Sequence, residues 1–382
     1  MKAMKTAVAG FAMTAALLAM HDAALAKGPT ALGEAAQSPL VLAKETKGNS
    51  IDFSKFPFGL EEGRTEDVQM TFSQEISDPD GGSGSIEYIL SMPYLEVEKQ
   101  GEDEVTILFP DTQNALMKIT GPDGEPVEMN IDMTSKAMEM TFMRDGERMS
   151  YSGKAESFGV NLEPTEQLDI AYNITGKGLA IKGAGAAEQD YSDFKNLDID
   201  YDYTLDSATF DIAATPPPES GEPGVKASGE MGETIATGLM RDGRMEGETA
   251  MNDLTIKVAE PMPLDVFMGK MRVQMALPTK ATEEPQPVRY VIEMEEIDLD
   301  EQIWNMADPQ KVFPRELNKA VIDLEMMAMM FASPFDAQAM AELEQAGMPP
   351  IMPTGVIINS IAFDGLGLKV DAKGEEIGRA HV

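Results

Sequence analysis

From about residue 66, the chain alternates apolar and polar residues with the period of two that is typical of β-strands. Val68, Met70 and Phe72 alternate with polar residues, and Val105 and Ile107 repeat the pattern after a glycine-containing turn. Apolar side chains at every second position lie on one face of a strand. The pattern therefore predicts strands that bury one face and leave the other in water.

The segments between these strands are rich in the residues that form hairpin turns. DPDGGSGS at 78–85, TGPDGEP at 120–126 and MRDGE at 143–147 each place Asp and Gly between two apolar alternations, and MRDG recurs at 240–243. Such turns join neighbouring antiparallel strands. We therefore predict a mainly β fold, an extended or curled antiparallel sheet built from hairpins.

Helical patterns are confined to the last third of the chain. Residues 300–307 can form a short helix with Asp300 as its N-cap. Residues 334–346 form a better candidate, because Ser333 can cap the first turn and Pro334 suits its first position. One or two short helices are expected here.

The two ends of the chain do not resemble the strands between them. Residues 1–26 combine a basic start, an apolar run and the small-residue pattern of Ala24-Leu25-Ala26, which predicts a removable signal peptide and export to the periplasm. Residues 27–50 lack periodicity and are expected to form a flexible arm. Residues 377–382, IGRAHV, match one reading frame of a common sequencing adapter, so we expect the natural sequence to depart from this one after Glu376 and to continue beyond it.

A proline- and glycine-rich segment divides the strand-forming sequence. Residues 216–224 contain too many prolines and glycines for a strand. We expect a loop there, between a β-rich region at 51–215 and a second at 225–376 that carries the helices.

Charge and composition remove several classes of function. The formal net charge of −36 repels phosphate backbones and anionic lipid surfaces, so nucleic acid is not an expected partner. The chain has no cysteine and two histidines, of which His21 lies in the predicted signal peptide and His381 in the adapter-like end. Catalysis by a Ser-His-Asp or Cys-His system and zinc sites built on His or Cys are therefore not expected. No cofactor is indicated, and no segment after the signal peptide approaches the length of a membrane span.

Methionine is the unusual residue of the remaining sequence, with 30 in the chain. Its flexible, polarizable side chain suits an interior that accepts varied apolar shapes. Many methionines fall on predicted inward faces, including Met129, Met133, Met138, Met140, Met245, Met251, Met326 and Met329. We take Met129, Met133, Met138, Met140 and Trp304 as candidate ligand-binding residues.

Three functions follow from this pattern, and the sequence leaves all three open. A non-enzymatic protein could bind a lipid-like apolar ligand or an envelope protein in the concavity of its sheet. A structural or assembly protein could use the same methionines to fill a closed core. A carboxylate-dependent enzyme acting on polysaccharide remains the third possibility, although so many acidic residues give no means of choosing a pair.

The segment DEQIWNMADPQKVFPRELNKAVIDLE resembles the signature region of the alphaproteobacterial exported family called domain of unknown function 2125. The resemblance rests on Trp304, the Asp308-Pro309 pair and the Pro314-Arg315 pair. It differs from the family in lacking a tryptophan-bearing helix within residues 27–60. The resemblance implies an exported β-rich protein and no specific activity. From its residue types, the segment is expected to form a structural cap on the sheet around Trp304, with ligand binding as the alternative.

Overall fold

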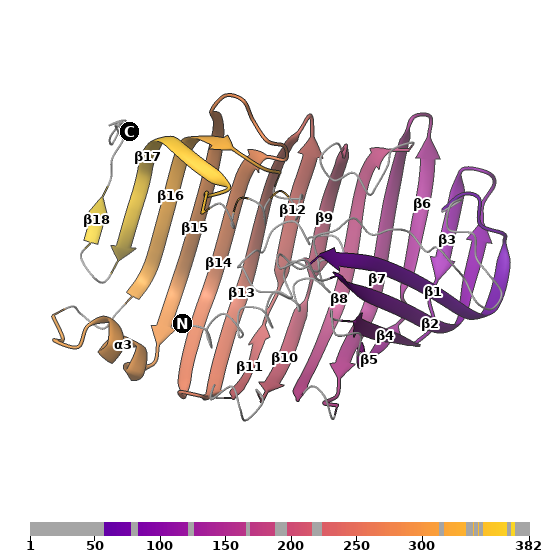
Figure 1. The fold of residues 1–382 in the computed structure, drawn as a ribbon, viewed down its shortest axis with the longest axis horizontal. Helices are drawn as coiled ribbons and strands as arrows, with labels where there is room; N and C mark the ends of the chain where they lie inside the picture. The colour runs from indigo at the N-terminus through magenta and orange to yellow at the C-terminus, as the bar shows by residue number, and fades with distance from the viewer. Residues whose placement is uncertain are drawn as a thin grey trace. The chain divides into compact units, whose positions relative to one another are not determined.

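The computed structural model describes residues 57–77, 83–120, 126–165, 169–187, 197–215, 224–312, 317–333, 339, 343, 347–364 and 368–370. The predicted signal peptide, the flexible arm, almost all of the 216–224 loop and the adapter-like end lie outside these residues. The prediction of a mainly β, antiparallel fold with little helix is confirmed (Figure 1).

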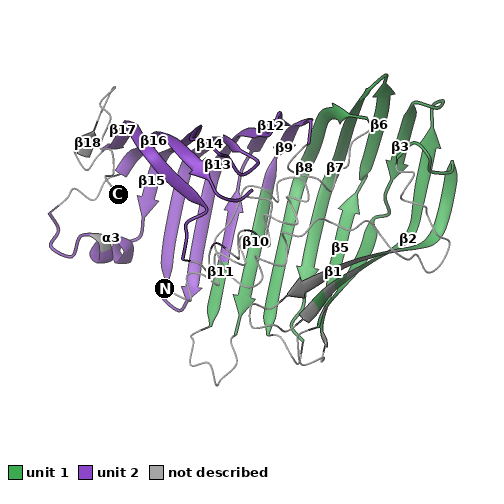
Figure 2. Cartoon of the chain, turned by 45° about the horizontal axis from the view of Figure 1, so that its top comes forward, with its two compact units in different colours: residues 1–192, 208–227 green, residues 193–207, 228–382 purple. Residues whose placement is uncertain are grey.

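The chain divides into two compact units, which Figure 2 shows in green and purple. Unit 1 comprises residues 1–192 and 208–227, and unit 2 comprises residues 193–207 and 228–382. The chain passes between the units three times, because residues 193–207 belong to unit 2 although unit 1 residues flank them on both sides. β11 (Val225–Met231) spans the last of these boundaries.

Unit 1 is an antiparallel sheet in which two long strands are interrupted. One is divided into β3 and β4, and the other into β5 and β6. β2 pairs with β1 on one side and with β3 and β4 on the other, and β5 and β6 together pair with β7. Pairs β3–β6, β4–β5, β7–β8 and β8–β10 complete it. The strands are β1 (Gly63–Ser77), β2 (Ser83–Lys99), β3 (Glu104–Leu108), β4 (Thr112–Thr120), β5 (Pro126–Lys136), β6 (Glu139–Asp145), β7 (Arg148–Leu162), β8 (Ile170–Ala186) and β10 (Ser207–Ala214).

The apolar face of the unit 1 sheet contains a packed core. Figure 1 shows β1 and β2 running across the front of the other unit 1 strands at a steep angle, so this sheet is curled. Several side chains of this face are almost fully buried, with Val105 at 0%, Ile107 at 1%, and Met117, Met129 and Ile174 each at 2% relative exposure. Unit 1 therefore has a packed core of its own.

Unit 2 is an antiparallel meander with one short helix. Its strands pair in the order β9–β12–β13–β14–β15–β16–β17–β18. The elements are β9 (Ile199–Leu205), β12 (Thr234–Arg241), β13 (Arg244–Glu260), β14 (Leu264–Pro278), β15 (Gln286–Leu299), α3 (Glu301–Ala307), β16 (Leu317–Met330), β17 (Ile351–Asp364) and β18 (Leu368–Val370).

Helix α3 forms where the sequence predicts it. The Asp300 side chain accepts a hydrogen bond from the backbone N–H of Gln302 at 2.6 Å and so caps the first turn. At the other end the backbone N–H of Asp308 donates to the carbonyl of Trp304 at 2.8 Å. Of the second predicted helix, Ala339 and Leu343 are helical, and the rest of residues 334–346 lies outside the described residues.

In four neighbouring strands of unit 2, the alternation of apolar and polar side chains shifts by one residue. The four shifts lie opposite one another in the register. Apolar side chains there stand three positions apart instead of two: Met251 and Leu254 on β13, Met268 and Met271 on β14, Met294 and Ile297 on β15, and Leu317 and Ala320 on β16. Each step leaves two residues between its apolar pair. One of the two in each strand lies opposite its counterpart in the next strand, and we call this row, Asp253, Gly269, Glu296 and Asn318, the crease.

Left-handed backbone accompanies this shift on β13 and β15, the first and third of the four strands. Asp253 and Glu296 have φ angles of 51° and 56°, and Gly269 lies between them in the register. An extra residue in this conformation reverses the alternation of side chains, as in a β-bulge. Because every strand shifts at the same level, cross-strand partners stay aligned on both sides of the crease. The apolar face therefore continues along the whole length of β13, β14 and β15.

Unit 1 has the same feature. Apolar positions step by three between Met92 and Leu95 on β2 and between Gly176 and Leu179 on β8. Asp67, which lies opposite Pro93, and Gly178 have positive φ angles of 55° and 66°. The interruptions between β3 and β4 and between β5 and β6 also fall at this level. A concerted shift is thus how both units keep long strands amphipathic.

Candidate functional site

The candidate site is the apolar face of β13 to β17 in unit 2, which we call the methionine face. Directly opposed residues of paired strands project from the same side of a sheet. The register therefore places these side chains in three rows: Met251, Met271, Met294, Ala320 and Phe363; Thr249, Val273, Ile292, Ile322 and Ile361; Gly247, Met275, Tyr290, Leu324 and Ile358.

Exposure distinguishes the methionine face from the closed core of unit 1. Met251, Met271, Met275 and Met294 are all half-buried, as are the Val, Ile, Leu, Phe and Tyr side chains of the same rows. Within the rows only Ala320, at 1%, is fully buried. Half-buried apolar side chains that adjoin one another form a contiguous apolar surface, which in soluble proteins often marks an interaction site.

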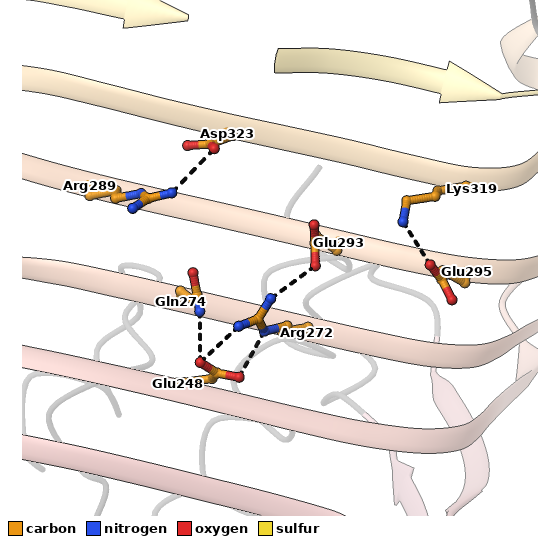
Figure 3. Close-up of polar contacts among 8 residues, drawn as sticks. All are labelled: Glu248, Arg272, Gln274, Arg289, Glu293, Glu295, Lys319 and Asp323. Atoms are coloured by element: carbon orange, nitrogen blue, oxygen red, sulfur yellow. Dashed lines mark hydrogen bonds and ion pairs between the residues drawn. The ribbon is translucent and has the colours of Figure 1, made fainter. Parts of the chain in front are cut away.

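The opposite face of the same strands carries charges, and Figure 3 shows how they meet. Arg272 on β14 binds both carboxylate oxygens of Glu248 on β13, at 2.7 and 3.1 Å, and contacts Glu293 on β15 at 3.3 Å. Gln274 donates to Glu248 at 2.7 Å. We call these residues, with the pairs Lys319–Glu295 at 2.7 Å and Arg289–Asp323 at 3.3 Å, the charge ladder.

The charge ladder has the properties of a solvated outer face. The side chains of Arg272 and Glu248 are 42% and 39% exposed, and exposed ion pairs contribute about 0.2–1 kcal/mol each. Hydrogen bonds from Arg272 and Gln274 lower the pKa of Glu248. The hydrogen bond from Lys319 likewise lowers the pKa of Glu295. These two carboxylates therefore stay ionised at neutral pH, whereas a glycosidase acid needs a raised pKa.

The four methionines predicted to bind ligand lie together in unit 1. Met129 and Met133 belong to β5, Met140 belongs to β6, and Met138 lies in the interruption between these strands. Their positions place them on one apolar face, with the same step of three residues between Ser135 and Met138. Met129 is 2% exposed and the other three are half-buried. Their role in binding stays a prediction.

Trp304 belongs to unit 2, where it is 8% exposed. Asp308 follows at 5% exposure, and one of its carboxylate oxygens accepts a hydrogen bond from the backbone N–H of Val312 at 3.0 Å. Pro309 lies in the turn between them, whereas Pro314 and Arg315 lie outside the described residues. The burial of Trp304 is compatible with the expected cap.

Sequence reasoning noted Met251 as an inward residue but did not separate the methionine face from the core of unit 1. Met326, also expected inward, pairs with Val288 and Val356 and extends this face. Met245 is 4% exposed and Met329 is half-buried. The step of three residues that recurs in four successive strands could have shown that these side chains share one face, but unit 1 has the same step, so it does not separate the methionine face from the core of unit 1.

Searches for other kinds of site and for relatives give three findings. Among the described residues, no group of three or more His, Asp or Glu side chains is placed to hold a metal ion, and no helix is long and apolar enough to cross a bilayer. Comparisons with protein families, curated proteins and solved structures found no match. The resemblance carried by Trp304, Asp308 and Pro309 therefore stays a prediction.

Proposed function

We propose that the protein is an exported, non-enzymatic carrier that binds a lipid-like apolar ligand on the methionine face of unit 2. The observation that carries this proposal is the exposure of that face. Its three rows of apolar side chains are half-buried, whereas the unit 1 face contains side chains that are almost fully buried, such as Ile107, Met117 and Met129. Burial of apolar surface contributes roughly 25 cal/mol per Å², so an acyl chain laid along these rows would be held mainly by the hydrophobic effect.

The side chains of the face suit a ligand of variable shape. Methionine adapts its conformation at little cost and contacts apolar groups through a polarizable sulfur. Met251, Met271 and Met294 lie side by side on three neighbouring strands next to the crease. Such a row offers a continuous contact surface without a fixed shape. The charge ladder covers the opposite side of these strands, which directs the ligand to the methionine face.

Periplasmic export fits this proposal and rests on the N-terminal sequence. A carrier between membranes must enclose acyl chains while itself remaining in water. A surface with net charge −36 favours solubility. An envelope protein could occupy the same face instead, since contiguous apolar surfaces also serve protein partners.

Native mass spectrometry of the protein purified from a bacterial periplasm tests the proposal. The wild type should retain a stoichiometric apolar molecule that extraction with organic solvent releases. Met271→Glu, which places a charge in the middle of the face, should lose that molecule. Met327→Glu is the matched control, because Met327 is 42% exposed and projects from the other side of β16. A ligand-free wild type that folds normally would contradict the proposal.

A structural or assembly role is the second candidate, and the core of unit 1 favours it. Met117 and Met129 are cross-strand partners at 2% exposure each, so at this level unit 1 uses methionine as packing material. If the whole protein acts in this way, the ligand-free mass should be accompanied by a co-purifying protein, and Met271→Glu should disrupt that complex.

A further inference from the structure

The distribution of positive charge in unit 2 bears on which lipid the methionine face accepts. On β13 to β16 the lysines and arginines project from the polar face, as the register of Lys270, Arg272, Arg289 and Lys319 shows. The three rows of the methionine face contain no charged residue. A ligand phosphate would therefore find no cationic partner among the described side chains of these rows.

The arginines of the unit 2 sheet already have carboxylate partners. Arg241 contacts Asp198 at 2.8 Å, Arg244 contacts Glu246 at 3.0 Å, and the charge ladder engages two more arginines. If one of these arginines left its partner to bind a phosphate, the freed carboxylate would lie beside the phosphate and repel it. An anionic head group at the border of the methionine face would therefore meet a negative field that these arginines already fail to offset.

From these observations we infer that the methionine face selects lipids whose head group is zwitterionic, such as phosphatidylethanolamine, over anionic lipids such as phosphatidylglycerol. This inference rests on the proposed function. The apolar rows supply affinity for both lipids equally, because both carry the same acyl chains. Local charge supplies the discrimination: the rows contain no cation, and a local negative potential of roughly 2 kT, within the range common on strongly charged surfaces, disfavours a univalent anion roughly fivefold to tenfold.

A competition experiment with the full chain measures this selection. Delipidated protein is incubated with vesicles of dioleoyl-phosphatidylethanolamine and dioleoyl-phosphatidylglycerol in equal amounts, at about 0.1 M salt, re-isolated, and its bound lipid quantified by mass spectrometry. We expect phosphatidylethanolamine in roughly fivefold to tenfold excess. At about 1 M salt, where the screening length falls to roughly 3 Å, the excess should shrink.

Two variants separate a local effect from net charge. Thr249→Lys adds a cation to the middle row of the methionine face and should move the bound lipid toward phosphatidylglycerol. Ala276→Lys adds the same charge between Glu246 and Arg289 on the polar face, and it should leave the ratio nearly unchanged. Equal responses of the two variants would contradict selection at the face.

The outcomes distinguish this inference from the proposed function. Uptake of both lipids in equal amounts, or an excess of phosphatidylglycerol, would overturn the selection while leaving the carrier in place. No uptake of either lipid by wild-type protein would overturn the carrier itself. A dimer or a protein complex without lipid would assign the methionine face to a protein partner and would overturn both.

Discussion

Tyr172 offers the sharpest test of the packing in unit 1. Its side chain is 6% exposed on β8, opposite Leu162 and two residues before Ile174. Among the described residues, its hydroxyl is the only buried side-chain oxygen or nitrogen without a hydrogen-bond partner. A buried polar group without a partner costs about 1–3 kcal/mol. Tyr172→Phe removes that group and keeps the ring.

The expected gain follows from two opposing contributions. Removing the unpaired hydroxyl recovers about 1–3 kcal/mol, while the void of one oxygen atom costs a few tenths of a kcal/mol at about 24 cal/mol per Å³. We therefore expect Tyr172→Phe to stabilise unit 1 by about 1–2 kcal/mol. Urea unfolding at pH 8 measures this difference. Tyr151→Phe is the control, because Tyr151 is equally buried on β7 but has an interaction partner.

The pH dependence of the free energy of unfolding gives a second, independent test. Burial raises the pKa of Tyr172 above its ordinary value of about 10. A raised folded-state pKa means that the hydroxyl ionises on unfolding above about pH 10, so wild type loses stability as pH rises through that range. The advantage of Tyr172→Phe should grow there by up to about 1.4 kcal/mol per pH unit. A variant less stable than wild type at pH 8, or a constant gap, would refute the reasoning.

Three further predictions concern the crease, the charge ladder and α3. Asp253→Gly should stabilise unit 2 by up to about 1 kcal/mol and Asp253→Val should destabilise it by about 1–2 kcal/mol, since only glycine adopts this positive φ without strain; equal effects in urea unfolding would exclude a left-handed crease. Arg272→Met should cost about 0.2–1 kcal/mol at pH 7. Because the pKa of Glu248 is lowered in the folded state, that cost should shrink as pH falls below the ordinary glutamate pKa of about 4.3 and disappear once pH is below the lowered folded pKa; a cost that does not change on acidification would disprove the ionic contribution. Trp304→Ala should destabilise by about 3–5 kcal/mol, whereas Met306→Ala, at 58% exposure, should change little in thermal unfolding; similar small losses would remove the structural role of the tryptophan.

The alternation of apolar and polar residues was sufficient to predict strands, because a strand that buries one face must follow a period of two. Hairpin turns such as MRDG at 143–146 and 240–243 were predicted for the same local reason, and both join neighbouring strands. The cap of α3 by Asp300 is equally local. Each of these features depends on residues that are close in sequence.

The crease could have been predicted, but only by comparing strands with one another. A single step of three residues, such as Met251 to Leu254, looks like the end of one strand and the start of the next. Its meaning emerges from recurrence at Met268 to Met271 and Met294 to Ile297. When every strand shifts at one level, pairing is retained, and the long strands of unit 2 run on without a break.

Whether each apolar face is buried or exposed could not be predicted from the sequence. Met129 in the core of unit 1 and Met271 on the methionine face of unit 2 occur in similar alternating strands, yet one is fully buried and the other half-buried. The difference arises from contacts between elements far apart in sequence, such as the passage of β1 and β2 across the front of unit 1 (Figure 1). Local patterning specifies which side is apolar and leaves open what covers it.

Methionine oxidation, mapped by peptide mass spectrometry on folded protein, tests the central claim most directly. Oxidation by dilute peroxide requires access to the sulfur. The account predicts that Met251, Met271 and Met294 oxidise in delipidated protein and are protected after loading with phosphatidylethanolamine, while Met117 and Met129 stay reduced in both states. If the unit 2 methionines resist oxidation without lipid as fully as those of unit 1, or if lipid leaves their oxidation unchanged, the methionine face is not a ligand-binding surface.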